Sequence, residues 1–90
     1  MANSSLEKIA EIEKRLSETH ETIQCRDETC IVFNSGWVGH LIPLFGGVVM
    51  EYYESVEDAK NDFADEDGDI YDLSLPVDEL VRLLEKEGEE

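Results

Sequence analysis

The segment that most constrains the fold is residues 31–50, IVFNSGWVGHLIPLFGGVVM, which has no charged residue although 33% of the chain is charged. Acidic, amphipathic sequence flanks this segment on both sides. Since an amphipathic helix needs an apolar surface to cover, we expect the segment to supply the core of one small domain over residues 1–90. A membrane span is disfavoured because its four glycines and Pro43 would interrupt a helix in lipid.

The first flanking segment, residues 4–19, has the pattern of an amphipathic helix. Ser4 and Glu7 are spaced for a capping box, in which each side chain accepts a hydrogen bond from an amide near the helix start. One face carries apolar residues at helical spacing, namely Leu6, Ile9, Ala10, Ile12 and Leu16. We expect this face to pack on the core segment.

A short second helix is predicted over residues 56–64. It begins with another capping signature, Ser55 and Asp58. Its inward face is expected to be formed by Val56, Ala59 and Phe63.

A third helix is predicted over residues 76–87. Pro76 fits its first turn, where a missing amide hydrogen costs nothing. Gly88 fits a C-terminal stop, and residues 88–90 are expected to fray.

Short β-prone runs between the helices predict an antiparallel sheet of three to four strands over about residues 22–53. Pro43 cannot donate to a strand ladder, so Pro43–Gly47 is expected to be a loop between the last two strands. Residues 70–73 are expected to add a short strand at the sheet edge. The predicted fold class is therefore α+β, with the helices packed on the sheet.

Cys25 and Cys30 flank a predicted turn, and a symmetric hairpin places them opposite one another. Their Cβ atoms would then lie about 4.5–5.5 Å apart, near the separation in a disulfide. No secretion signal is recognised at the N-terminus, which favours two reduced, partly buried thiols. A metal site that adds His20 and His40 is a further alternative, although the spacing lacks the CxxC knuckle of zinc sites.

No motif in the sequence indicates catalysis. A thiol activated by His40 would need a third orienting group, and nothing marks one. The run Asp65–Asp69 resembles the first half of a calcium loop, but Ile70 replaces its glycine and Pro76 its bidentate glutamate. We expect a protein that is not an enzyme, with no cofactor and no dedicated metal site.

The strongest functional signal is the charge. The chain has 7 Lys and Arg residues against 23 Asp and Glu residues, which gives a net charge of −16. An ordinary small soluble domain has a net charge of magnitude about 2 to 8. Nucleic acid and anionic membranes are not expected as direct partners, because both are polyanions.

Acidic residues are densest between Glu51 and Asp72, where ten carboxylates occur with one cation, Lys60. Asp58 and Asp62 are expected to lie one turn apart on the short helix, separated by about 6 Å along its axis. A fixed carboxylate array attracts a basic cleft as a phosphate backbone does, and it speeds association.

Our first hypothesis is therefore a small acidic protein-binding module. By analogy of charge and size it is an inhibitor of the DNA-mimic type found in phages and mobile elements, which blocks the basic nucleic-acid-binding site of a partner protein. The expected partner-binding residues are Glu54, Glu57, Asp58, Asp62, Asp65, Glu66, Asp67 and Asp69. Tyr52, Tyr53 or Tyr71 is expected to add an apolar anchor where exposed.

The alternative is a non-catalytic accessory or structural domain with a salt-adapted acidic surface. It would bind a partner, or a second copy as a homodimer, through the apolar 36–48 segment. Trp37, Leu44 and Phe45 are the expected contacts, at a loop tip. For either hypothesis we expect a cytoplasmic protein.

Overall fold

The computed structural model describes residues 4–25 and 27–89, apart from the side chains of Ser4 and Ser5. Within these residues, the helices are α1 Ser4–Thr19, α2 Val56–Lys60 and α3 Val77–Glu89. The strands are β1 Glu21–Cys25, β2 Glu28–Val32, β3 Val38–Leu44, β4 Gly47–Tyr53, β5 Glu66–Asp67 and β6 Tyr71–Asp72. The predicted α+β class is confirmed, with more strands than expected.

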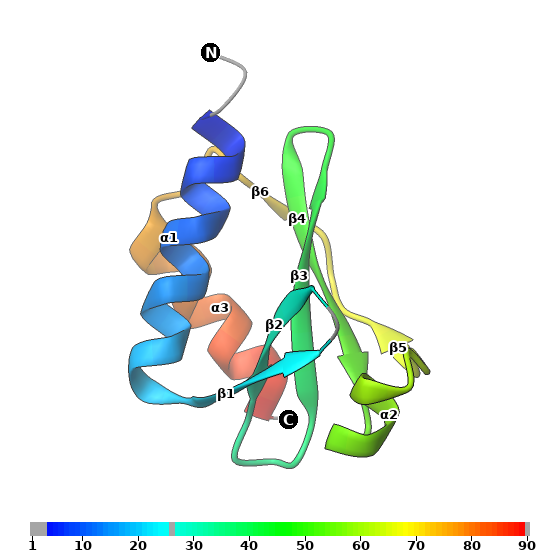
Figure 1. Ribbon diagram of the computed structural model, residues 1–90. Helices are drawn as coiled ribbons and strands as arrows, with labels where there is room; N and C mark the ends of the chain where they lie inside the picture. The colour runs from blue at the N-terminus through cyan, green and yellow to red at the C-terminus, as the bar shows by residue number, and fades with distance from the viewer. Residues whose placement is uncertain (1–3, 26, 90) are drawn as a thin grey trace.

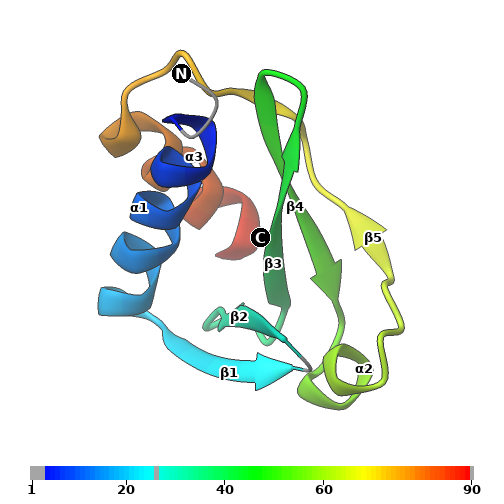
Figure 2. The same ribbon diagram turned by 45° about the horizontal axis from the view of Figure 1, so that its top comes forward.

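The sheet is antiparallel, with the strand order β1-β2-β3-β4-β5, and β6 also pairs with β4. α1 and α3 lie together over one face of the sheet (Figure 1). α2 lies at the end of β4, on the same side of the molecule as β5 (Figure 2). The two short strands therefore cover the edge of β4 that β3 leaves open.

The main core lies between the sheet and the two long helices. Its side chains come from both layers, with the smallest exposures at Ile12, Leu16, Ile31, Phe33, Val48, Met50, Leu80 and Leu84. Burial of one such aliphatic or aromatic side chain stabilises the fold by about 1.5–3 kcal/mol. This packing fixes the two long helices on the sheet.

α1 has the predicted bounds, Ser4–Thr19. Ile9, Ile12 and Leu16 are buried as expected, whereas Ala10 is exposed and Leu6 is 57% exposed because it precedes the packed part of the helix. The predicted capping box depends on the Ser4 side chain, which lies outside the described residues.

β3 and β4 form a long hairpin, and the loop predicted at Pro43–Gly47 is wrong. Both strands continue to the pair Leu44↔Gly47, which leaves Phe45 and Gly46 as a two-residue turn. β2 pairs only with the first residues of β3. At Pro43, β3 therefore has a neighbouring strand on one side alone, and proline is tolerated there. Gly46 has φ 79°, which favours glycine in such a turn.

The register predicted for the first hairpin is also wrong. Cys25 pairs with Glu28 and Cys30 with Ile23, so the cysteines are diagonal neighbours on the face away from α1 and α3. Both are 1% exposed, and no disulfide joins them. They pack with Val38, Tyr53 and Ala59 in a second, smaller core beneath α2.

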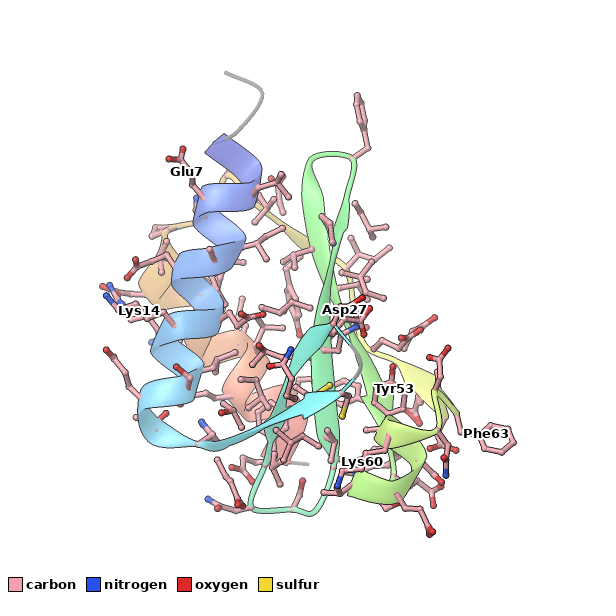
Figure 3. The ribbon with its side chains drawn as sticks, in the orientation of Figure 1. Glu7, Lys14, Asp27, Tyr53, Lys60 and Phe63 are labelled. Carbon is pink, nitrogen blue, oxygen red and sulfur yellow. The ribbon has the colours of Figure 1, made fainter. Side chains whose placement is uncertain are left out.

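α2 begins as predicted but ends at Lys60, before the expected end at Ala64. Asp62 has φ 59°, a left-handed conformation that does not continue a helix. Phe63, expected to point inward, is 69% exposed and points away from the sheet (Figure 3).

The segment after α2 contributes two strands to the sheet edge. β6 confirms the short strand expected within residues 70–73, whereas β5 lies inside the run Asp65–Asp69, where no strand was predicted. β4 is buried at nearly every position. Its outer backbone groups need partners, and β5 and β6 supply them.

α3 runs through Gly88 to Glu89, so Gly88 is not the predicted stop. Pro76 lies directly before α3, at its N-cap position. Its carbonyl accepts a hydrogen bond from the Leu80 amide at 3.0 Å. A Cβ added to Gly88 would approach the Phe33 ring to 2.5 Å, so glycine allows α3 to pack closely there. Fraying of residues 88–90 stays a prediction; Glu90 lies outside the described residues.

No helix within residues 4–25 and 27–89 combines the length and the apolar composition needed to cross a membrane.

Candidate partner-binding surface

The eight carboxylates expected to bind a partner belong to α2, to β5 and to the loops around them. These elements lie on the same side of the molecule, beyond β4 (Figure 2). All eight residues are exposed except Asp58, which is half-buried. We refer to this set as the acidic edge: Glu54, Glu57, Asp58, Asp62, Asp65, Glu66, Asp67 and Asp69.

A helix cap fixes the start of the acidic edge. The Ser55 hydroxyl accepts a hydrogen bond from the Asp58 amide at 3.1 Å, which confirms the predicted capping signature. Glu57 and Asp58 therefore occupy the first turn of α2, where the helix dipole favours carboxylates.

Asp65 folds back onto the start of α2. Its carboxylate accepts a hydrogen bond from the Glu54 amide at 2.8 Å, and its own amide donates to the Tyr52 carbonyl at 2.9 Å. Hydrogen bonding with Asp65, then burial, and then the charges of Asp65 and Glu54 raise the pKa of Asp58 above its ordinary value. Like charges are therefore held close together at this end of the acidic edge.

Asp62 does not stand one helical turn from Asp58, as the sequence predicted. α2 has ended before Asp62, and its left-handed backbone separates it from the helix. The carboxylate brought beside Asp58 is instead that of Asp65. Spacing on a continuous helix could not indicate this contact, because it depends on the return of the chain to β4.

The described arginines do not neutralise the acidic edge. Arg15 pairs with Glu11 and Asp78, and Arg82 pairs with Glu79 at 3.1 Å. These pairs lie on α1 and α3, in the helical layer. The cation within the acidic segment itself is Lys60, at the end of α2. A large negative field therefore remains on the β5 side of the sheet.

A pocket of about 350 Å³ adjoins the acidic edge. Residues 66–69 form one wall, and Trp37, Tyr52 and Glu87 form the remainder. These residues come from β5 and the loop after it, the turn before β3, β4 and α3. Glu87 was not predicted to belong to this surface, because only the packing of α3 on the sheet brings it to β5.

Glu87 is held by three hydrogen-bond donors. The hydroxyls of Tyr52 and Tyr71 donate to it at 2.6 and 2.9 Å, and the Asp69 amide donates at 2.9 Å. Burial, followed by the hydrogen bond and charge of Glu87, raises the pKa of Tyr52 well above its usual range, so its hydroxyl remains a donor.

Two of the tyrosines proposed as exposed anchors are buried. Tyr52 is 6% exposed and Tyr53 is 1% exposed, whereas Tyr71 is half-buried. The hydroxyl of Tyr53 donates to Glu51 at 3.0 Å on the face away from α1 and α3. Tyr52 and Tyr53 therefore pack in the two cores and do not meet the condition of exposure under which an anchor was expected.

The apolar contacts of the alternative hypothesis do not share one loop tip. Phe45 is fully exposed and Leu44 is 39% exposed in the β3–β4 turn. Trp37 instead precedes β3 at its opposite end and is half-buried beside Tyr52, with ring centroids 6.0 Å apart. Ile70 is 68% exposed. Its side chain faces Gly47, which places it near the β3–β4 turn.

The proposed metal ligands do not converge. Cys25, Cys30 and His40 lie on the sheet face away from the long helices, whereas His20 packs against Phe33 under α1 and α3. The ring nitrogens of His40 lie 3.5 Å from Glu28 and 3.9 Å from Glu51. Among the residues that the structure describes, no group of three or more His, Cys, Asp or Glu side chains is arranged to hold a metal ion.

Comparison of the chain with protein-family models, curated proteins and solved structures gave no match.

Proposed function

We propose that the protein is a small, non-catalytic module that binds a basic surface of a partner protein through the acidic edge. The observation that carries this proposal is the exposure of carboxylates on α2, β5 and their loops, with the arginines of the described residues paired elsewhere. A partner rich in lysine and arginine supplies the missing counter-charges. We expect the complex to form in the cytoplasm.

The partner surface that fits this charge best is a nucleic-acid-binding site. Such a site is built to neutralise a row of phosphates, and it responds to a row of fixed carboxylates through the same long-range field. The protein then competes with nucleic acid for that site and acts as an inhibitor of the DNA-mimic type. Steering by charge makes association fast at low salt and slower as salt is added.

Glu57, Glu66 and Asp67 are the sharpest test positions on the acidic edge. All three are exposed. Asp65 is less suitable, because its carboxylate also holds the Glu54 amide. The test variant is therefore Glu57→Gln/Glu66→Gln/Asp67→Asn. A matched control removes the same charge from the opposite side, with Glu7→Gln/Glu18→Gln/Glu21→Gln.

The experiment immobilises each variant and exposes it to the heparin-retained fraction of a cell lysate, which is enriched in nucleic-acid-binding proteins. Bound proteins are then displaced with duplex DNA. We expect the wild type and the control to retain the same protein, and the test variant to retain about tenfold less. Equal retention by the two triple variants, or a bound protein that neither DNA nor salt displaces, would contradict the proposal.

The exposed tip of the β3–β4 hairpin favours a second candidate function. Phe45 and Leu44 form an apolar projection there, with Ile70 beside it. In this alternative, the protein is an accessory domain that binds a partner or a second copy through this tip, and its acidic surface is an adaptation to high salt. Phe45→Ser would then abolish binding that salt strengthens, whereas binding by the acidic edge is weakened by salt and insensitive to Phe45→Ser.

A further inference from the structure

The pocket beside β5 is small. Its volume of about 350 Å³ lies at the small end of ligand pockets, which span about 300–1,000 Å³. It is lined by two aromatic residues, Trp37 and Tyr52, and by Glu66, Asp67, Asp69 and Glu87. Glu66 pairs with Tyr52, so its side chain shares the pocket face of the sheet. Gly68 completes the wall, so the occupant meets aromatic and negatively charged surfaces together.

Glu87 brings a fixed negative charge to this pocket. Its three hydrogen bonds come from neutral donors, namely two tyrosine hydroxyls and the Asp69 amide. Within the described residues, no lysine or arginine forms an ion pair with Glu87. The carboxylate is therefore oriented by the fold and lacks a counter-charge, which a cationic ligand would provide.

Gly68 makes this orientation of Glu87 possible. A Cβ added to Gly68 would collide with both oxygens of the Glu87 carboxylate. A side chain at this position would therefore displace Glu87 from its donors. The loop after β5 approaches α3 closely at Gly68, and this approach shapes the pocket. The shape of the pocket therefore does not depend on the total charge around it.

We propose that this pocket binds the guanidinium group of an arginine side chain presented by the basic partner. The assignment of the arginine to a partner rests on the proposed function. A guanidinium is flat and interacts favourably with aromatic rings, and its fork of donors matches carboxylates. Lysine offers a more strongly hydrated point charge and gains less from aromatic walls.

The chain contains a single tryptophan, Trp37, so its fluorescence reports directly on the pocket. The probe is N-acetyl-arginine amide, and the matched control is N-acetyl-citrulline amide, which has a similar shape without the charge. We expect a saturable change in emission with the arginine probe and none with the citrulline probe. Absence of saturation, or an equal response to both probes, would overturn the inference.

Three variants separate the pocket from the general negative field. Glu66→Gln should weaken binding of the arginine probe about five- to tenfold, whereas Glu18→Gln on α1 removes the same charge and should leave it within about twofold. Gly68→Ala keeps every charge but displaces Glu87, and we expect a loss of at least the size seen for Glu66→Gln. If Gly68→Ala binds as the wild type does, the pocket geometry is not responsible.

The source of the arginine is tested with a short basic peptide, acetyl-Lys-Arg-Lys-amide. A partner's side chain is supported if the peptide binds more tightly than the single-residue probe and Glu57→Gln reduces that advantage. Equal affinities would overturn the assignment to a partner. The lysate experiment tests the acidic edge through Glu57, Glu66 and Asp67 together, so capture with no arginine response rejects the pocket alone. A response without capture rejects the proposed function alone.

Discussion

Gly39 is the position where the packing of the sheet can be tested most directly. It lies in β3 opposite Tyr52, on the face covered by α1 and α3. A Cβ added there would lie 2.5 Å from Sδ and 2.8 Å from Cγ of Met50, and 3.1 Å from Cε2 of Phe33. Met50 is 0% exposed and Phe33 is 2% exposed, so neither side chain can swing into solvent.

Two opposing effects set the result of Gly39→Ala. Overpacking of a filled core costs about 1–3 kcal/mol. Replacement of glycine within a strand returns about 0.5–1 kcal/mol, because the unfolded chain becomes less flexible. We expect a net loss of about 1 kcal/mol in the free energy of unfolding, which corresponds to a fall in Tm of about 4–8 °C for a domain of this size.

The clash is isolated by a double-mutant cycle with Met50→Ala. That substitution alone costs about 2–5 kcal/mol, and it removes the two closest atoms. In its background, Gly39→Ala should be neutral or stabilising, which gives a coupling energy of about 1–3 kcal/mol. Urea unfolding at high salt, followed by circular dichroism, measures the four free energies.

Gly36→Ala is the control for this cycle. Gly36 has φ 101° and no atom within 4 Å of an added Cβ, so its cost is conformational. In the double variant, the losses of unfolding free energy caused by Gly36→Ala and by Met50→Ala should add within about 0.5 kcal/mol. If Gly39→Ala is equally additive with Met50→Ala, the close contact is not the cause of its effect, and the reasoning fails.

Three further substitutions are expected to give distinct results. Asp58→Asn should raise Tm at pH 7, because the pKa of Asp58 is raised in the folded state; thermal melts against pH should show this gain disappear below the ordinary pKa of 3.8. Asp72→Asn should do the opposite. Its carboxylate accepts the Ser74 amide at 2.8 Å and its pKa is lowered, so the variant is less stable at neutral pH and the difference closes as pH falls below 3.8. Gly88→Ala should destabilise α3 by overpacking against Phe33, by about 1 kcal/mol after helix propensity is counted. A rise in stability in urea unfolding would show that Gly88 is not closely packed.

Local periodicity predicted the parts of the fold that depend on one face of one element. The bounds of α1 follow from Ile9, Ile12 and Leu16, which are all buried. The first hairpin shows why register was not predictable. Side chains alternate with a period of two, so a shift of two residues leaves Cys25 and Cys30 on the same face and fits the pattern equally well.

β5 was missed because its own sequence gives no strand signal. Glu66 and Asp67 are poor strand formers, and they pair because β4 has an open edge. The useful signal lay in β4 itself, whose apolar residues at successive positions indicate burial on both faces, as is usual for a strand in the interior of a sheet. The pocket was beyond prediction, since Glu87 joins Trp37 and Tyr52 only through the packing of α3 on the sheet.

The charged residues of β5 also govern whether one sheet can join another. A sheet edge with unpaired backbone groups is a template for a second chain, and charge on the edge strand opposes such pairing. β5 places Glu66 and Asp67 on one edge, and β1 places Glu21 on the other. Near the pI of 4.2 much of this repulsion is lost. The edges can then meet strand to strand, so mild acid should promote assembly of the protein through its sheet.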